Sequence, residues 1–570
     1  MVTKSDEAIS RQPTWIGGVN DFLLPDLIPE TSCVSMLNLD ASEIGTLRRR
    51  PPVSTRRSYL TGLDGIDQQP RLLKVFQDRH HGPVLIAITD ASDGTSHVFI
   101  DDGTSSTPLD LVSPHKLDSD CDIVPLFNRA YIVQPGQATI FWEWGNVSLH
   151  VEEVGTWKER FPPCGTAAYF KGRGWAGDRD IVFYSTFFAA SELESPQLIW
   201  DTQAQGHRVT TGFVVKVLPY RTERLLVLTT GGFEVFLPNQ VSPTFTQRSI
   251  ISSSIGCSSK QTAHILGEDV LWIDHRGNLR SLIKTEADEP VGIVNEPTSL
   301  QIQGTIDRET KTRLFTSRAT IWNGDYFFAI PTDRSPYPTE LWRYSPRSRA
   351  FYGPWIINFD PDGSTIGDRL PFFINGLATC QFPGDIERLY ILTRTAAGAC
   401  RLVQFDPDRT SPDRKDGATV MRSRLTTRGH VFRNPERRKF PINLRIEGRF
   451  TRLPLTASMP SGATLESFGG ACSGITLGIS IRADQGRWAL PSVPSLIYFT
   501  PDAGPVLRTA DATLPFRLRP LSRQHANIHL PGTVIGRELE IEIEQKDLTA
   551  EFEIISLGLM AEERPVEEDA

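Results

Sequence analysis

One pattern recurs along the middle of the chain. It consists of a polar turn, a short run of aromatic or β-branched residues, a turn containing Gly or Asp, and a second such run, which together are typical of a β-hairpin. Seven such units occur, and successive units begin 44 to 63 residues apart. The units lie at residues 81–101, 128–144, 172–185, 222–236, 267–282, 323–355 and 386–406. A single period sustained over so many units indicates a repeat architecture.

The spacing favours a β-propeller. Propeller blades contain four short strands in about 40 to 50 residues, so the pattern predicts six or seven blades, with loop insertions in the longer later intervals. A series of Greek-key sandwiches also has short strands separated by frequent turns and is the alternative. The 44 Gly, 41 Pro and 5 Met agree with many turns and few long helices. We therefore expect an all-β fold.

The pattern of polar and apolar residues changes after residue 406. Residues 407–417 are polar and contain Pro, as linkers do. Longer strands with alternating polarity follow at 442–450, 474–484 and 536–563. In the last of these, Leu539, Ile541 and Ile543 alternate with glutamates, which is the period of a half-exposed strand. These strands predict a separate C-terminal β-sandwich.

Four regions are therefore expected. Residues 1–60 form an N-terminal arm whose strands join the C-terminal domain or close the propeller. The propeller occupies 61–410, the C-terminal β-sandwich occupies 411–560, and 561–570 form a disordered tail.

Charge and cysteine content limit the class of protein. The net charge of -8 argues against a protein that grips nucleic acid through its phosphates, because such binding depends on an excess of Lys and Arg. The seven cysteines are scattered and form no Cys-x-x-Cys pair, which predicts buried free thiols in a protein made in reducing cytoplasm. The polar first residues lack the pattern of a signal peptide, and no apolar run reaches the roughly 18 residues of a membrane span.

Motifs for catalysis or metal binding are missing from the sequence. There is no Gly-x-Ser-x-Gly elbow, His-Glu-x-x-His or phosphate-binding loop. His80 and His81 are adjacent, so on a strand they would face opposite sides. Asp101-Asp102-Gly103 and the Asp-Pro-Asp-Gly of 360–363 predict tight turns rather than calcium loops. We therefore expect no catalytic residue, no metal and no cofactor, and we do not expect an enzyme.

Two basic segments are candidates for contact with other molecules. The first is Arg48-Arg49-Arg50, directly before two prolines, and the second is the run 422–449, with nine Lys or Arg against two Glu. Contact with another subunit is favoured over contact with DNA, and the alternative is a solvated strand end or a charge-protected edge strand. The predicted assembly-interface residues are Arg48, Arg49, Arg50, Arg437, Arg438 and Lys439.

The N-terminal residues resemble a known family. Trp15-Ile16-Gly17-Gly18-Val19-Asn20, then Asn38-Leu39-Asp40, Gly45 and Arg48-Arg49-Arg50-Pro51 resemble the N-terminus of the tail nozzle proteins of short-tailed bacteriophages. The hairpin after Ile255-Gly256-Cys257, from Gly267 to Arg280, is similar to a blade pattern of the same family. The family also has an Arg-rich hairpin that opens its C-terminal domain.

The resemblance implies a structural virion protein, made in the host bacterial cytoplasm and located in the virion tail. It implies a homohexameric ring that docks on the head-to-tail adaptor, supports tail fibres or tailspikes, and lets viral DNA pass through its lumen without sequence-specific binding. The C-terminal β-sandwich would be the family's platform domain. The lumen should be acidic or mixed in charge, because each retained phosphate contact slows the DNA.

Two other hypotheses belong to different classes. One is a β-propeller that degrades or binds host-surface glycans, and the other is a monomeric propeller that acts as an interaction module. Clustered carboxylates at the centre of the propeller would favour the first.

Overall fold

The computed structural model of the chain describes most residues between Asp6 and Arg564. The segments outside the description are 1–5, 42–44, 59–68, 79, 92–93, 106, 118–119, 127, 152–160, 187–199, 201–205, 240–245, 289–295, 309–310, 332–334, 336, 358–371, 395–399, 406–414, 417–418, 422, 433–435, 453–474, 489–495, 498–523, 531–533, 546–549 and 565–570. Most of the predicted linker, the turn predicted at 360–363, and Cys472 fall outside the described residues.

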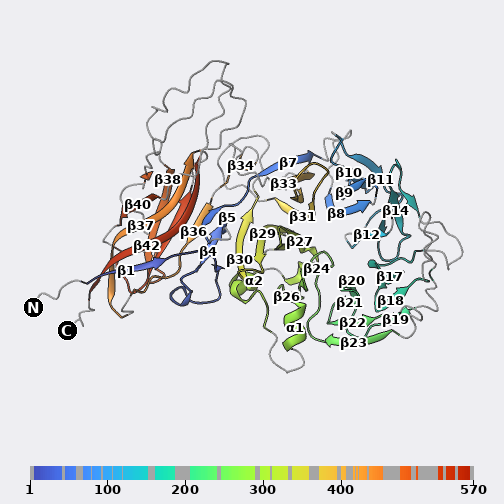
Figure 1. The fold of residues 1–570 in the computed structure, drawn as a ribbon, viewed down its shortest axis with the longest axis horizontal. Helices are drawn as coiled ribbons and strands as arrows, with labels where there is room; N and C mark the ends of the chain where they lie inside the picture. Colours follow the sequence, from blue (N-terminus) through green and yellow to red (C-terminus); the bar gives the residue numbers. More distant parts are fainter. Residues whose placement is uncertain are drawn as a thin grey trace, which may run out of the picture.

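Seven antiparallel sheets follow one another in the described part of residues 53–405, and Figure 1 shows them standing around a ring. The first contains β8 (Gln69–Asp78), β9 (Gly82–Asp90), β10 (Ser96–Asp101) and β11 (Leu109–Val112). The second contains β12 (Asp122–Leu126), β13 (Arg129–Val133), β14 (Ile140–Glu143) and β15 (His150–Val151). The third contains β16 (Thr166–Phe170), β17 (Arg173–Asp178), β18 (Ile181–Tyr184) and β19 (Gly206–Arg208).

The other four sheets are also antiparallel, and three of them have four strands. The fourth contains β20 (Val214–Tyr220), β21 (Arg224–Thr229), β22 (Phe233–Leu237) and β23 (Gln247–Ser252). The fifth has three strands, β24 (His264–Leu266), β25 (Asp269–Ile273) and β26 (Leu279–Ser281), followed by helix α1 (Leu282–Asp288). The sixth contains β27 (Arg318–Trp322), β28 (Asp325–Pro331), β29 (Pro338–Ser345) and β30 (Ala350–Ile356). The seventh contains β31 (Phe373–Cys380), β32 (Arg388–Arg394), β33 (Cys400–Phe405) and β7 (Val53–Ser58).

The all-β class and the seven hairpins are confirmed. Each predicted unit forms the second and third strands of one sheet, and the sixth unit also includes the fourth strand. In the fifth unit Gly277 has a positive φ of 86°, and the Asp274 carboxylate accepts the backbone N–H of Asn278, which makes the turn that the sequence predicts. The four-stranded antiparallel sheets have the build of propeller blades.

Apolar clusters between consecutive sheets hold the ring together. Phe76 of the first sheet packs edge to face on Trp142 of the second, for example, with ring centroids 6.1 Å apart. Similar clusters follow between each pair of neighbours. The last joins Leu73 of the first sheet to Tyr390 and Leu402 of the seventh, so the cycle closes. Burial of each such side chain stabilises the fold by about 1.5 to 3 kcal/mol. The sheets therefore form a closed, propeller-like ring.

The N-terminal part of the chain completes this ring. Strand β7 pairs with β33, with Val53 opposite Phe405, and so supplies the outer strand of the seventh sheet. The first and last parts of the ring are thus hydrogen-bonded to each other, which holds the ends of a long segment together.

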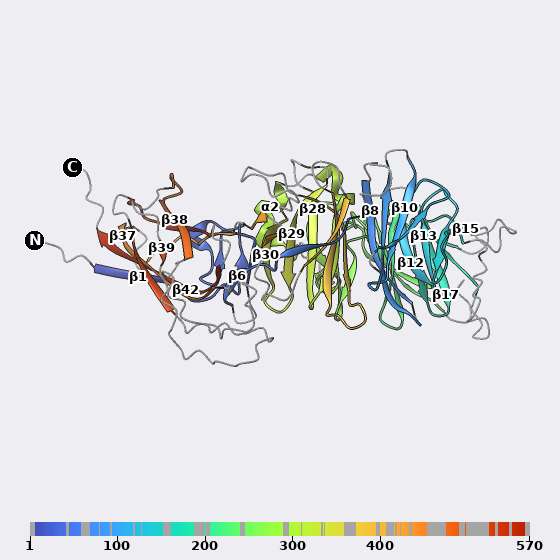
Figure 2. The same cartoon turned by 90° about the horizontal axis from the view of Figure 1, so that it is seen from above.

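Two further sheets lie beside the ring and form the C-terminal sheet pair (Figures 1 and 2). One contains β40 (Gln524–His529), β37 (Arg438–Arg452), β42 (Ala550–Arg564), β6 (Leu47–Arg49) and β5 (Leu39–Ala41), with β1 (Asp6–Gln12) also on β42. The other contains β39 (Leu496–Ile497), β38 (Ile475–Ala483), β41 (Leu539–Gln545), β36 (Ser423–Thr426) and β4 (Ser35–Leu37). N-terminal strands therefore belong to both sheets. Apolar side chains of the two sheets share one core, as Leu444 and Ile446 do with Ile479 and Ile541.

Short elements connect these parts. They are β2 (Gly18–Val19), β3 (Ser32–Cys33), η1 (Pro25–Leu27), η5 (Leu300–Ile302), α2 (Gln303–Asp307), η6 (Lys311–Thr316), β34 (Lys415–Asp416) and β35 (Thr419–Val420).

The structure contradicts part of the prediction for the C-terminal tail and agrees with the prediction for the cysteines. Strand β42 continues to Arg564, with Ala561 fully buried and Glu563 almost so, because both pack between β1 and β37. The prediction of a disordered tail from residue 561 is therefore wrong for residues 561–564, and 565–570 lie outside the description. The prediction of buried free thiols is confirmed for the six cysteines that the structure describes.

Candidate functional site

The N-terminal residues that carry the family resemblance lie where the ring meets the C-terminal sheet pair. The Asn38 carboxamide oxygen accepts hydrogen bonds from Arg50 Nε at 3.0 Å and from the backbone N–H of Ile356 at 2.8 Å. The Arg50 guanidinium also donates to the carbonyl of Ile356 at 2.8 Å, and Trp355 Nε1 donates to the carbonyl of Leu39 at 2.9 Å. Strands β5 and β30 are thereby joined through side chains from residues about 300 positions apart.

Two more contacts make this junction rigid. Arg343 of β29 binds the carboxylates of Asp40 and Asp325. Burial opposes the charge of Arg343, but these two carboxylates outweigh it and raise the pKa of the guanidinium. Gly18 has a φ of 65°, and a Cβ there would lie 2.2 Å from the carbonyl oxygen of Phe351, so the close approach of β2 to β30 requires glycine. We call Gly18, Asn38, Leu39, Asp40 and Arg50 the N-terminal joint.

The structure gives an intramolecular role to three of the six predicted interface residues. Arg49 and Arg50 are each 1% exposed, and Arg49 donates to the carbonyl of Met421 at 2.8 Å. Lys439 is fully buried, and its ammonium donates to the carbonyl of Arg437 at 2.6 Å. Each of these side chains donates to carbonyl oxygens within the chain, and none of the three lies on its surface.

The other three predicted residues reach the surface. Arg438 is exposed, and Arg48 and Arg437 are half-buried. A role of these three in assembly stays a prediction.

An exposed apolar loop lies beside the joint. Phe22, Leu23, Leu24 and Leu27, which we call the apolar loop, are 52%, 37%, 61% and 61% exposed. Its backbone is held in place, because the Asn20 carboxamide accepts the N–H of Leu23 at 3.2 Å and the N–H of Leu27 reaches the carbonyl of Leu24 at 2.9 Å. A fixed loop that presents apolar side chains to solvent is typical of a contact surface.

The first strands of the sheets bring charged groups together at the centre of the ring. Asp122 of β12 is bound by Lys216 Nζ of β20 at 2.8 Å, by Gln261 Nε2 at 3.1 Å and by Lys74 Nζ of β8 at 3.4 Å. Lys260 Nζ donates to the carbonyl of Gly165 at 2.5 Å and pairs with the Asp120 carboxylate at 2.9 Å. We call Lys74, Asp122, Lys216, Lys260 and Gln261 the axial cluster.

The remaining sheets take part through further hydrogen bonds. Thr166 Oγ1 of the third sheet accepts the N–H of Val217 at 3.4 Å, and Arg318 Nε of the sixth sheet donates to the carbonyl of Asn375 in the seventh at 2.7 Å. Polar contacts thus also join the third sheet to the fourth and the sixth sheet to the seventh.

The charge state of Asp122 follows from its neighbours. Burial alone would raise the pKa of its carboxyl, but Lys216 and Lys74 outweigh burial and hold that pKa below its usual range. Burial lowers the pKa of Lys74 to about 8. Asp122 is therefore ionised at neutral pH and is not able to serve as a general acid there.

The axial cluster also closes the centre of the ring. Asp122 bridges Lys74 and Lys216 through contacts of 3.4 and 2.8 Å. The major groove of a DNA duplex is itself about 12 Å wide, so a duplex does not fit through the ring of one chain. Any channel for DNA requires several copies of the chain.

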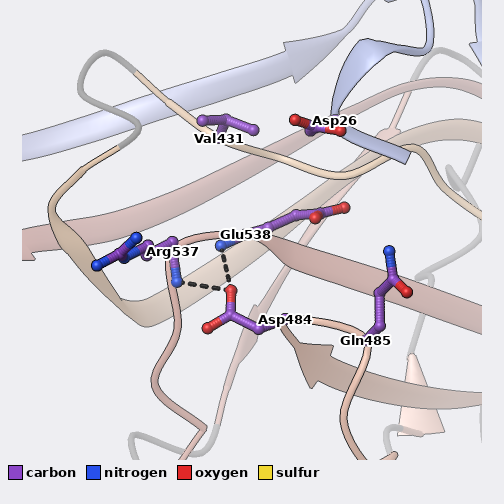
Figure 3. A pocket seen from close by; sticks show the side chains of 6 residues that line it. All are labelled: Asp26, Val431, Asp484, Gln485, Arg537 and Glu538. Carbon is purple, nitrogen blue, oxygen red and sulfur yellow. Dashed lines mark hydrogen bonds between the residues drawn. The ribbon is translucent and has the colours of Figure 1, made fainter. Parts of the chain in front are cut away.

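A pocket of about 330 Å³ lies in the C-terminal sheet pair (Figure 3). Asp26, Val431, Asp484, Gln485, Arg537 and Glu538 line it. Burial, together with the charges of Glu540, Asp26 and Asp484, raises the pKa of Glu538 to about 7. Asp484 accepts the backbone N–H groups of Arg537 and Glu538 at 2.8 and 2.9 Å, so it shapes the turn before β41.

His430, next to this pocket, should make stability depend on pH. It is fully buried, with Nδ1 2.9 Å from Ser10 Oγ, and burial followed by the charge of Arg428 lowers its pKa from 6.5 to about 3. Because the unfolded chain takes up the proton first, the contribution of neutral His430 is complete above pH 6.5 and is lost as the pH falls toward 3. Between pH 8 and pH 5, wild type should lose about 2 kcal/mol more unfolding free energy than His430→Gln.

Urea unfolding of both proteins at the two pH values measures this difference. Comparison with the variant removes the contribution of Glu538, whose raised pKa acts in the opposite direction. Equal pH dependence of the two proteins would show that His430 does not titrate as described.

The structure also shows the surroundings of His81 and the turn that begins at Asp101. The Nδ1 atom of His81 lies 2.8 Å from the carboxylate of Asp78, and the imidazole ring stacks on the ring of Trp144. Asp101 accepts the N–H of Gly103 at 2.9 Å, and Gly103 has a φ of 81°, which confirms the turn. Among the described residues no group of three or more His, Cys, Asp or Glu side chains has the geometry to hold a metal ion. In the described part of the chain no helix combines the length and apolar character of a membrane span.

Comparison with known proteins gives a distant structural similarity. No protein-family model matches the chain, and no curated protein sequence matches it. The chain is similar to the structure of YCF48 from Cyanidioschyzon merolae, at 10% sequence identity and a TM-score of 0.35. The match covers 63% of this chain and 100% of that one.

Proposed function

We propose that the chain is the subunit of the ring-shaped tail nozzle of a short-tailed bacteriophage. Its fold would be a β-propeller of seven blades beside a C-terminal β-sandwich platform. The observation that carries the proposal is the N-terminal joint. The residues on which the family resemblance rests, including Gly18, Asn38 and Arg50, make the contacts that join the ring to the C-terminal sheet pair. The resemblance thus concerns residues that determine how the two parts sit together.

In this proposal the DNA channel lies between subunits. Because the axial cluster fills the centre of each ring, the genome end would be held, and then released, through a lumen enclosed by several copies. One end of the assembled nozzle would dock on the head-to-tail adaptor, and its outer surface would hold tail fibres or tailspikes. The net charge of -8 supports a lumen through which DNA slides without strong phosphate contacts.

The apolar loop and the exposed arginines would contribute to assembly. Apolar side chains at the centre of a contact contribute most of the binding energy, and charges at the rim set its specificity. Phe22, Leu24 and Leu27 are suited to the first role and Arg438 to the second. The same axial cluster gives no support to a glycan hydrolase at the ring centre, because the carboxylate of Asp122 is shared between lysines.

The mass of the purified chain tests this proposal. We expect a closed oligomer at a multiple of the chain mass of 63.6 kDa, and by family analogy six copies. Leu24→Asp should lower that mass to the single chain, because it places a charge in the apolar contact. Val112→Asp, at an apolar side chain 60% exposed on β11, is the matched control and should leave the oligomer intact. A wild-type chain that is monomeric at high concentration would contradict the proposal and favour an interaction module.

A further inference from the structure

Two ammonium groups of the axial cluster share a single carboxylate. Lys216 Nζ lies 2.8 Å from one oxygen of Asp122, and Lys74 Nζ lies 3.4 Å from the other. That second oxygen also accepts Gln261 Nε2 and the backbone N–H of Ile123, at 3.1 and 3.0 Å. Asp122 is therefore the single anion that two ammonium groups share, so positive charge exceeds negative charge by one in this group.

Among the described residues, no ion pair joins Lys74 or Lys216 to a second carboxylate. The Asp120 carboxylate pairs with Lys260 at 2.9 Å. Arg318 is buried and donates to backbone carbonyls, among them those of Asn375 at 2.7 Å and Ser317 at 3.0 Å. The centre of the ring therefore holds an excess of buried cations, which is unfavourable unless a counter-charge is present.

The two lysines retain hydrogen-bond donors that Asp122 does not use. An ammonium group has three N–H donors. Within the part of the chain that the structure describes, Asp122 is the one partner of Lys216 and of Lys74. The side chains of Lys74 and Lys216 are 24% and 12% exposed, while that of Asp122 is fully buried. Both ammonium groups therefore keep donors for a further acceptor, and both side chains retain some contact with solvent.

We propose that Lys74 and Lys216 bind a small oxyanion, of the size of inorganic phosphate, on the side of the two ammonium groups opposite Asp122. The anion accepts charge-assisted hydrogen bonds from both lysines and neutralises the excess charge. Because both side chains are largely buried, the site admits a free oxyanion and excludes a phosphate that carries a nucleoside. This site is independent of the proposed function.

Isothermal titration calorimetry with inorganic phosphate, in a phosphate-free buffer of constant ionic strength, tests the site. Wild type should bind phosphate, and Lys74→Met and Lys216→Met should each weaken binding at least about tenfold. Lys74→Arg keeps the charge and should bind within about threefold of wild type, which separates loss of the site from loss of folding. Lys284→Met, at a surface lysine paired with Glu296, is the matched control and should bind as wild type does. Adenosine monophosphate should bind at least about tenfold more weakly than phosphate.

Three results would overturn the site. The first is no binding by wild type up to about 10 mM phosphate. The second is unchanged binding in Lys216→Met. The third is binding of adenosine monophosphate as tight as that of phosphate, which would place the ligand on the outer surface.

Discussion

Arg50→Met should lower the free energy of unfolding by about 3 to 5 kcal/mol, because it removes one partner from a buried polar junction. The Arg50 guanidinium satisfies Asn38 and the carbonyls of Pro51 and Ile356, and it lies over the ring of Phe405 at 5.7 Å. Methionine fills a similar volume but leaves these buried acceptors without their donor. The loss should appear in the urea transition that separates the ring from the C-terminal sheet pair.

The control is an arginine of the second basic segment. Arg438 is exposed, so Arg438→Met should leave the urea transition unchanged. If Arg50→Met also left it unchanged, the N-terminal joint would not be what holds the two parts together.

Asp122→Asn should have a comparable effect, again about 3 to 5 kcal/mol, at the centre of the ring. The substitution removes the negative charge that Lys74 and Lys216 share, and leaves those cations largely buried without a partner. Adding Lys216→Met to Asp122→Asn removes one of the two cations. The double variant should therefore be more stable than the sum of the single effects, by about 1 kcal/mol or more.

Asp180→Asn is the matched control for this prediction. Asp180 pairs with Arg208 at 3.2 Å, but both side chains are well exposed, so the change should cost less than about 1 kcal/mol. Simple additivity of Asp122→Asn and Lys216→Met would contradict the coupling that the axial cluster requires.

The hairpins could be predicted because their information is local. In Asp269–Ile273, for example, four buried apolar residues follow Asp269, and the turn glycines Gly267 and Gly277 lie on either side of the run. The closing strand β7 has no such pattern, since Val53–Ser58 is mostly polar and its place depends on pairing with β33 about 350 residues later. Such long-range pairing leaves no trace in a short window of sequence.

The positions of the charged residues also depend on contacts between residues far apart in the sequence. Three consecutive arginines suggest a solvated strand end. Arg49 and Arg50 are nevertheless buried, because the carbonyls of Met421 and Ile356 accept hydrogen bonds from their guanidinium groups. The axial cluster is not among the predicted sites, although the sequence contains a signal for it. Lys216 is the single charged residue of β20, and Lys74 interrupts the apolar run from Leu72 to Phe76 in β8. A charge in such surroundings must find a partner on a neighbouring strand.

Electron microscopy of the purified full-length chain tests the central proposal most directly. The account predicts closed rings of several subunits around a channel wide enough for a whole DNA duplex, whose major groove alone is about 12 Å wide. Each subunit in such a ring should show its own closed propeller-like centre. Images of single chains alone, or of rings whose only opening is the centre of one propeller-like ring, would contradict it.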